Sequence, residues 1–492
     1  MNSSTSYPKP NDKISFKPVS PFDLFYQLTY MSAMAAAGIT RSKTFEVAAQ
    51  SSSEAAAYFT AINMLVDELR YDYPEACRRV GARAKSENMK SFLLRLSDAL
   101  RSGEPLADFL AREAEVQGEH YQNSYERDLE ALKQWSNAFS SIVISVALIV
   151  IIQVISSMLY SMNQTTILGL VSAGLLMSGF GTWIIWRSAP HEIMNVMASE
   201  GSHDQRLSLR LLRTTIPLGI MTASLLYIVG LDTGWILIAF ALFLVPVGAI
   251  SLISDRHVTK KDVEFSTFLR STGGMASSTG TTLKEALTKI DLTSFPALEP
   301  DINRLSTRLQ ALVEPEICWR KFAQETGSRL ISDVISIFYR GIRIGGDPER
   351  VGFLCSLFVA KTTQLRAKRR LTSGTFSGLA AVMQVVVSGL MVFVLSIVQN
   401  FAELVKTLMP TGEGTQTDMS IGMADFSAGE LQFLAMITLM MIIVLATVSA
   451  LASIATDGGY KLKVALFLAV TTFVSGVCYL VVPPLVDSIL KA

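Results

Sequence analysis

Residues that could perform chemistry are few in this sequence, and their spacing does not assemble a site. Neither the four histidines nor the four cysteines are spaced as in a metal centre, and we expect the cysteines to be buried thiols. No phosphate-binding loop, HExxH zinc helix or GxSxG nucleophile elbow is present. Gly273-Gly274 and Gly345-Gly346 lack a preceding strand and a Lys-Ser/Thr pair, so we interpret them as turns. The sequence therefore predicts no catalytic, cofactor-binding or metal-binding residue, and a protein that is not an enzyme.

Seven long apolar segments occupy much of the chain, which is 50% hydrophobic and 17% charged. None of them contains Asp, Glu, Lys, Arg or His, and a helix of each length can cross a hydrocarbon core of about 30 Å. The most polar residues inside them are Gln153 and Gln384, which we interpret as partners in hydrogen bonds between helices. The predicted spans are 138–159, 166–186, 214–231, 235–254, 376–398, 431–456 and 464–486.

The charges of the connecting segments predict the orientation in the cell membrane. Segment 187–213 carries four arginines against three acids, and 255–372 carries nineteen Lys and Arg against thirteen acids. Segment 399–430, by contrast, holds one Lys and five acids. Because basic segments remain in the cytosol, the N-terminus and the segments 187–213 and 255–372 are expected inside and 399–430 outside. Seven crossings then place the C-terminus outside.

Two modules with helical patterning precede the groups of spans and repeat the same landmarks. In both modules apolar residues recur at spacings of three and four, which predicts amphipathic helices and no sheet. A glycine suits the end of a helix, and a proline suits the first turn of the next helix. Gly103 with Pro105, and Gly346 with Pro348, therefore each mark a joint between two helices. The predicted turn residues are Gly38, Gly103 and Pro105 in the first module, and Gly280, Gly346 and Pro348 in the second.

These observations predict an all-α, polytopic membrane protein built from a duplicated unit of helical module and membrane anchor. The polar, proline-containing start of the chain has no apolar run and is interpreted as a flexible tail, not a signal peptide. The predicted parts are a tail (1–20), a first cytosolic module (21–137), four transmembrane helices (138–254) with a basic loop (187–213), a second cytosolic module (255–372), and three transmembrane helices (373–492) with an acidic external loop (399–430).

The landmark residues also carry a resemblance to a known family. The run from Phe25-Tyr26-Gln27-Leu28 to Ala37-Gly38-Ile39, the joint Gly103-Glu104-Pro105-Leu106, and their second copies at Gly280 and Gly346-Asp347-Pro348 resemble the type II secretion F-domain family. Its members are platform proteins of type IV pilus, type II secretion and archaellum machines. Bacterial members have a simpler plan of module, two spans, module and one span. The larger number of spans here is similar to the archaeal members, in particular the membrane platform of the archaellum.

The resemblance implies a function and a set of partners. Such a platform couples a cytosolic hexameric ATPase to the insertion of pilin-like (archaellin) subunits and to filament assembly or rotation. It implies a homodimer surrounded by membrane lipids, with no cofactor and no nucleic acid. The absence of a nucleotide motif in this sequence fits that division of labour, because another chain would supply the energy.

Basic residues of the second module are the predicted ATPase-docking residues, because complementary charge speeds and orients docking. Arg340 and Arg343 are the preferred candidates, because they are expected to lie farther from the bilayer. The remaining candidates precede the next apolar segment, where the alternative is a topology signal and a contact for anionic lipid headgroups. These candidates are Arg366, Lys368, Arg369 and Arg370.

Three alternatives remain at this stage. The platform could serve an archaeal adhesion pilus or a type II-like secretion system instead of an archaellum. A membrane transporter is a second class, although transporters tend to keep ionisable residues within their spans. It would be favoured by substrate flux in proteoliposomes without a partner. A membrane-bound enzyme is the third class, and no set of nucleophile, base or metal ligands supports it.

Overall fold

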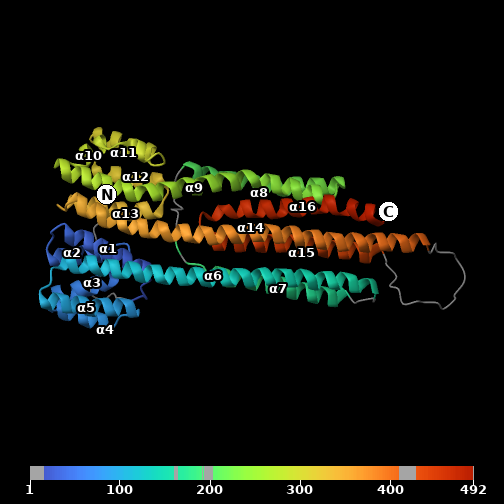
Figure 1. The fold of residues 1–492 in the computed structure, drawn as a ribbon, viewed down its shortest axis with the longest axis horizontal. Helices are drawn as coiled ribbons and strands as arrows, with labels where there is room; N and C mark the ends of the chain where they lie inside the picture. The colour runs from blue at the N-terminus through green and yellow to red at the C-terminus, as the bar shows by residue number, and fades with distance from the viewer. Residues whose placement is uncertain (1–15, 160–163, 191, 193–202, 409–427, 491–492) are drawn as a thin grey trace. The chain divides into compact units, whose positions relative to one another are not determined.

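The structure is a computed structural model that describes residues 16–159, 164–190, 192, 203–408 and 428–490 (Figure 1). Within these residues the chain is helical and contains no β-strand, which confirms the all-α prediction. Most of the predicted tail (1–20), part of the basic loop (187–213) and much of the acidic loop (399–430) lie outside the described residues. Contacts divide the chain into two compact units, made of residues 1–126 with 257–366 and of residues 127–256 with 367–492.

The two modules contain the same succession of helices, with one helix, four further helices and then a long helix. In the first copy these are α1 (Pro21–Ala36), α2 (Arg41–Ala49), α3 (Ala56–Asp67), α4 (Tyr73–Ala82), α5 (Glu87–Ser102) and α6 (Leu106–Leu159). In the second copy they are the end of α9 (Thr233–Thr279), α10 (Leu283–Lys289), α11 (Glu299–Gln310), α12 (Pro315–Thr326), α13 (Arg329–Arg343) and α14 (Pro348–Leu408), with a short 3-10 turn, η1 (Leu292–Ser294), after α10.

Glycines with a left-handed backbone separate corresponding helices in the two copies. Gly38 follows α1 with φ of 74°, and Gly280 follows α9 with φ of 58°. Gly103 ends α5 with φ of 76°, and its counterpart after α13 is Gly345 with φ of 102°. These values cost glycine little because it lacks a Cβ atom. Gly346, the landmark chosen from the sequence, has another role, because a Cβ on it would lie 2.7 Å from the Cβ of Ala37.

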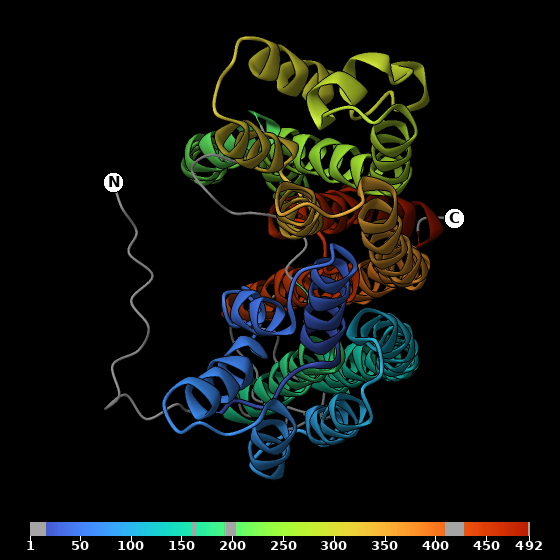
Figure 2. The ribbon, with the colours of Figure 1, turned by 90° about the vertical axis from the view of Figure 1, so that its left-hand side faces the viewer.

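Both modules belong to the same compact unit, and α1 lies at its centre. All residues from Leu24 to Ala35 are buried, so α1 has no solvent-exposed face over three turns. One side of α1 contacts α2, and another contacts α13 of the second copy. Figure 2 shows α1 in dark blue between the other blue helices and the orange α13. The aromatic ring of Phe358 on α14 lies 4.7 Å from that of Phe25, so the two copies pack against each other through α1, while the first copy also has a core cluster of its own.

The second unit contains the membrane-crossing parts of the chain. Among the described residues, seven helices are long and apolar enough to cross a membrane, which confirms the predicted number of spans. They are α6, α9 and α14, which also contribute residues to the first unit, together with α7 (Gln164–Ser188), α8 (His203–Val229), α15 (Ala428–Asp457) and α16 (Val464–Leu490). A 3-10 turn, η2 (Lys461–Lys463), joins α15 to α16.

Candidate functional site

The α13 helix carries the two preferred docking residues at its C-terminal end. Ser328 caps the start of α13, where its hydroxyl accepts a hydrogen bond from the backbone N–H of Ile331 at 3.2 Å. One face of α13 is buried, and Arg340 and Arg343 lie on the exposed side of its last turn. Basic groups there also interact favourably with the negative end of the helix dipole. The helix therefore presents two cations to solvent from a rigid, well-packed support.

The two arginines differ in the group that each guanidinium contacts. The Arg343 guanidinium donates to the Glu316 carboxylate at 2.6 Å, and both side chains are about half exposed. An exposed pair of this kind contributes only about 0–1 kcal/mol, so Arg343 can exchange Glu316 for another carboxylate at little cost. Arg340 reaches the hydroxyl of Tyr30 on α1 at 3.4 Å. Arg340 thus lies at the exposed edge of the contact between α13 and α1.

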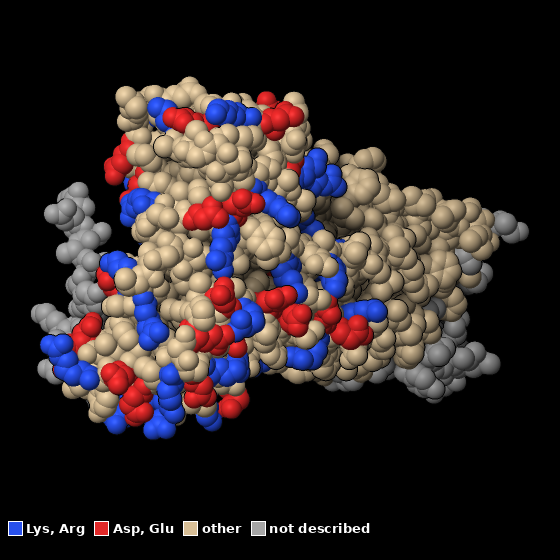
Figure 3. Space-filling model, turned by 60° about the vertical axis from the view of Figure 1, so that its left-hand side comes forward, with Lys and Arg blue, Asp and Glu red and all other residues tan. Residues whose placement is uncertain are grey.

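An open cavity lies beside the joint between α13 and α14. Its volume is about 470 Å³, and it is lined by Arg270, Gly274, Asp347, Glu349, Arg350 and Phe353. Asp347 caps α14, because its carboxylate accepts from the backbone N–H groups of Glu349 and Arg350, both at 3.3 Å. Arg350 also donates to Asp108 of the first copy at 3.0 Å. Lys and Arg side chains alternate with Asp and Glu over the visible surface of the modules (Figure 3).

Arg366 is placed in the interior of the first unit. Its side chain is 8% exposed and donates to the Asp262 carboxylate at 2.8 Å, and the Ser328 hydroxyl donates to the same carboxylate. This ion pair joins α14 to α9 and to the start of α13. Because the guanidinium is buried and paired, it cannot meet a partner at the surface, and our docking proposal does not include it. Lys368 is half-buried and has an interaction of its own.

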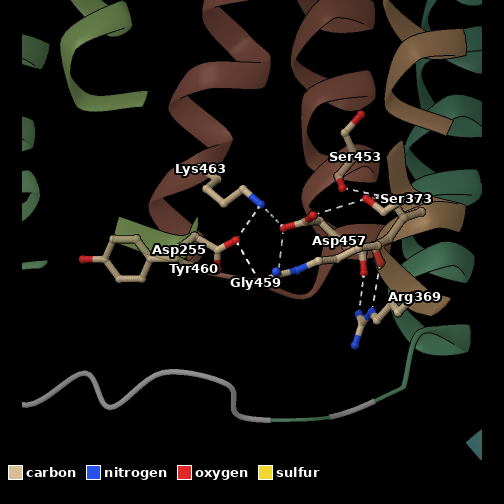
Figure 4. A network of polar contacts seen from close by, with 11 residues as sticks. Asp255, Arg369, Ser373, Ser453, Asp457, Gly459, Tyr460 and Lys463 are labelled. Carbon is tan, nitrogen blue, oxygen red and sulfur yellow. Dashed lines mark hydrogen bonds and ion pairs between the residues drawn. The ribbon is translucent and has the colours of Figure 1, made fainter. Parts of the chain in front are cut away.

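Arg369 and Arg370 belong to the second unit, where they lie at a buried charge cluster. Figure 4 shows Arg369 of this cluster together with Asp255, Asp457 and Lys463. Lys463 is its centre, since its ammonium group lies 3.1 Å from the Asp255 carboxylate and 2.5 Å from that of Asp457. Arg370 approaches Asp255 at 3.3 Å. We define the buried charge cluster as Asp255, Arg369, Arg370, Asp457 and Lys463.

Arg369 holds the end of α15 through main-chain carbonyl groups. Its guanidinium donates to the carbonyl oxygens of Ala455 at 3.0 Å, Thr456 at 2.9 Å and Pro190 at 2.8 Å. The last carbonyls of a helix have no partner within the helix, and a cation there also interacts favourably with the helix dipole. Gly458 follows with φ of 66°, and its missing side chain leaves room for the guanidinium. Arg369 is 2% exposed and is therefore excluded from our docking surface.

The arrangement of the buried charge cluster is suited to linking helices. Its members come from α9, α14, α15 and η2, so their ion pairs connect four elements that are distant in sequence. Backbone N–H groups contribute too, because Tyr460 donates to Asp255 and Gly459 donates to Asp457, both at 3.3 Å. Among the described residues, no group of His, Cys, Asp or Glu could hold a metal ion.

The cysteines lie where the sequence predicted them, in buried positions without disulfides. Burial raises the pKa of the Cys77 thiol to about 12 and raises that of Cys355 even further. A thiol with such a pKa carries almost no thiolate at neutral pH and is a poor nucleophile. Burial also raises the pKa of Tyr26 on α1 to about 12. The buried side chains of Cys77, Cys355 and Tyr26 therefore contribute to the packing of the interior.

Sequence reasoning missed the buried charge cluster, although a signal was present. Asp255 and Asp457 each follow the last residue of a predicted span, and Lys463 precedes the first residue of another. Each could be explained separately as the polar end of a span. The three spans were predicted to have these ends on the same side of the membrane. Only by considering Asp255, Asp457 and Lys463 together at those ends could their pairing have been predicted.

Comparisons with known proteins agree with the resemblance found in the sequence. Residues 28–154 match the family described as Type II secretion system (T2SS), protein F. A flagella accessory protein J from Methanocaldococcus jannaschii is 28% identical over 321 residues, which is 62% of this chain and 56% of that relative. A protein of the same name from Methanococcus voltae is 23% identical over 447 residues, or 88% of this chain and 78% of the relative. No solved structure matches. The predicted resemblance to this family is thus confirmed for residues 28–154.

Proposed function

We propose that this chain, an F-domain membrane protein similar to flagella accessory proteins J, is the membrane platform of an archaellum or type IV pilus-like assembly machine. In this role it couples a cytosolic hexameric ATPase to the insertion of pilin-like subunits and to filament assembly or rotation. Both modules and the N-terminus lie in the cytosol, and the spans anchor them in the cell membrane. The alternatives are the platform of an adhesion pilus or of a type II-like secretion system.

One observation carries this proposal, namely that two copies of the same helix order pack against each other in one compact unit. Phe25 on α1 and Phe358 on α14 lie in the contact between the copies, and α14 continues into the spans. A force applied to the α13 face therefore meets a packed body, because protein interiors are dense and resist deformation. The same packed unit exposes Arg340 and Arg343 to solvent. The raised pKa values of Cys77 and Cys355 leave these thiols unreactive. Both features suit a passive coupling element better than an enzyme.

Charge reversal on the α13 face tests the coupling to the ATPase. We expect Arg340→Glu with Arg343→Glu to weaken binding of the hexameric ATPase at least tenfold, or about 1.4 kcal/mol, through lost charge complementarity. The measurement is a titration of the full chain in nanodiscs with the ATPase at low and physiological salt. The full chain is required because α1 completes the core against which α13 packs.

The control reverses two exposed arginines of the first copy, Arg41→Glu and Arg101→Glu, which make no ion pair in the described contacts. Equal binding by the α13 variant and the unmodified chain would remove Arg340 and Arg343 from the docking surface. Loss of binding in the control alone would move the surface to the first copy. If no variant of the folded chain, nor the unmodified chain, binds the ATPase, the platform function itself is contradicted, and flux in proteoliposomes becomes the next measurement.

A further inference from the structure

Three arginines form a stripe along the first turns of α8. Arg206, Arg210 and Arg213 are spaced by four and three residues, so they fall within a sector of about 60° around the helix axis. All three side chains are exposed, and the described contacts join none of them to a carboxylate. The charge pattern of the sequence assigned these residues to a loop, whereas the structure places them on a helix that begins at His203. We call this set the arginine stripe.

The opposite side of α8 is the side that packs against the rest of the second unit. Ser208 is fully buried, and its hydroxyl lies 3.1 Å from that of Tyr460. Leu211 and Leu212 lie against an apolar cluster of α9 and α16. The arginine stripe therefore points away from the protein, and its orientation is fixed because the helix is packed on its other side.

Farther along α8, the sector that carries the arginine stripe becomes apolar. Ile228 in this sector is 79% exposed, and Ile220 and Met221 on its two flanks are 55% and 62% exposed. The apolar window of α8 is only 6% buried, the lowest share among the seven spans of the described residues. Exposed apolar side chains on a span contact lipid tails. The guanidinium groups thus lie next to the lipid-contacting surface of α8, at the end of the span where the headgroup region begins.

Aromatic residues mark the headgroup region elsewhere in the same unit. Trp183 and Trp186 near the end of α7 are 56% and 50% exposed, and Arg187 follows them. Tryptophan is enriched at the boundary between hydrocarbon and headgroups because its ring is amphipathic. At the end of α7 the apolar residues come first along the chain, then the tryptophans, then Arg187. On α8 the arginines come first and the apolar residues follow, so each helix has its arginines at one end of its apolar part.

We propose that the arginine stripe is a binding site for the headgroup of an anionic phospholipid, whose acyl chains lie along the apolar part of α8. A guanidinium binds phosphate oxygens with two parallel hydrogen bonds, and a basic residue near an anionic membrane surface attracts it. The site would hold an anionic lipid against the span with the lowest buried share among the described residues. It goes beyond the proposed function and does not require the ATPase or the filament subunits.

Charge favours a lipid over a second copy of this chain as the occupant. Closed dimers are most often two-fold symmetric, so a contact through α8 would bring the same patch of both copies together. Six guanidinium groups would then meet without carboxylates to neutralise them, and like charges in an interface cost several kcal/mol. A phospholipid supplies both the phosphate and the apolar chains that the two parts of the α8 surface require.

The test measures lipid retention by the full chain. The protein is reconstituted in phosphatidylcholine nanodiscs that contain a minor fraction of phosphatidylglycerol, then extracted, and the retained lipids are counted by native mass spectrometry. We expect the unmodified chain to retain phosphatidylglycerol in preference to phosphatidylcholine. Changing all three residues to glutamine (R206Q, R210Q, R213Q) should lower this preference about tenfold, while the corresponding lysine variant should keep most of it because the charge remains.

Two controls decide whether the stripe itself is responsible. The matched variant R41Q, R83Q, R101Q removes three exposed arginines of the first unit and should retain phosphatidylglycerol as the unmodified chain does. An equal loss in this control, or undiminished retention in the α8 glutamine variant, would overturn the proposal. So would a change in oligomeric state without a change in lipid retention, because the occupant would then be a second copy. Added inorganic phosphate should not displace the lipid; displacement would indicate a site for free phosphate.

A thermal unfolding midpoint and a monodisperse elution profile confirm that each variant is folded. Should the triple glutamine variant fail to fold, Arg210→Gln alone is used, because it removes the middle residue of the stripe and leaves the packed side of α8 unchanged. A single substitution that leaves the phosphatidylglycerol preference unchanged would count against the proposal.

Discussion

Replacing Lys463 by methionine is expected to destabilise the second unit by about 3–5 kcal/mol. The ammonium group of Lys463 lies between the carboxylates of Asp255 and Asp457, and its side chain is 6% exposed. Removing it leaves two buried carboxylates close together without their shared cation, and an uncompensated buried charge is the costly element of a broken ion pair. The measurement is the free energy of unfolding of the full chain in detergent micelles, followed by the loss of helical signal.

Lys461 provides a matched control within the same short turn. It lies two residues before Lys463, is exposed and makes no ion pair in the described contacts. Lys461→Met should therefore change the free energy of unfolding by no more than about 0.5 kcal/mol. Adding Asp457→Asn to the Lys463→Met variant should recover part of the loss, because Arg370 still pairs with Asp255 and Asp457 is the carboxylate that loses its cation. Equal stability of the two single variants would show that the cluster does not hold the helices together.

Replacing Gly273 by alanine should destabilise the first unit by about 2 kcal/mol. A Cβ atom on Gly273 would lie 2.2 Å from the carbonyl oxygen of Pro348, which is part of the backbone and cannot rotate away. α9 and the start of α14 would have to move apart to relieve this contact. Overpacking of this kind lowers the free energy of unfolding by about 1–3 kcal/mol or more. The gain of about 1 kcal/mol in helix propensity from glycine to alanine offsets part of that cost. The free energy of unfolding of the full chain is again the measurement.

The next residue on α9 separates the steric effect from the propensity effect. A Cβ atom on Gly274 would meet no atom within 4 Å, since this residue faces the open cavity beside the joint. Gly274→Ala should therefore be neutral or should stabilise the protein by up to about 1 kcal/mol. If both variants lose stability equally, the close approach of α9 and α14 does not constrain the fold.

Local properties of the sequence were sufficient to predict much of this fold. The spans were predictable because a membrane helix must satisfy its backbone internally and present apolar side chains over its whole length. The duplicated order of helices was visible because glycine is nearly alone in accepting a left-handed backbone at low cost. Thus Gly38, Gly103 and Gly280, which are recognisable in the sequence, mark the ends of α1, α5 and α9.

The candidate site was predicted less completely, because exposure depends on neighbours that are distant in sequence. Of the basic residues chosen for docking, Arg340 and Arg343 are exposed, whereas Arg366 and Arg369 are buried. Nothing in the run from Arg366 to Arg370 distinguishes its members, since all its charged residues are basic and lie on one continuous helix. The helix periodicity turns Arg366 toward Asp262 and Arg369 toward the end of α15, whereas Lys368 and Arg370 are half-buried.

The helical class, the number of spans and the duplication follow from the amino-acid sequence, because they depend on the local composition and backbone preferences of each segment. Tertiary packing was needed to establish that α1 is buried between its own copy and α13 of the second copy, and that Lys463 joins Asp255 to Asp457. It was also needed to place the arginines of α8 in one stripe opposite its packed face. These features depend on which surfaces meet, and burial, ion pairing and steric contact are properties of pairs of segments that no single segment encodes.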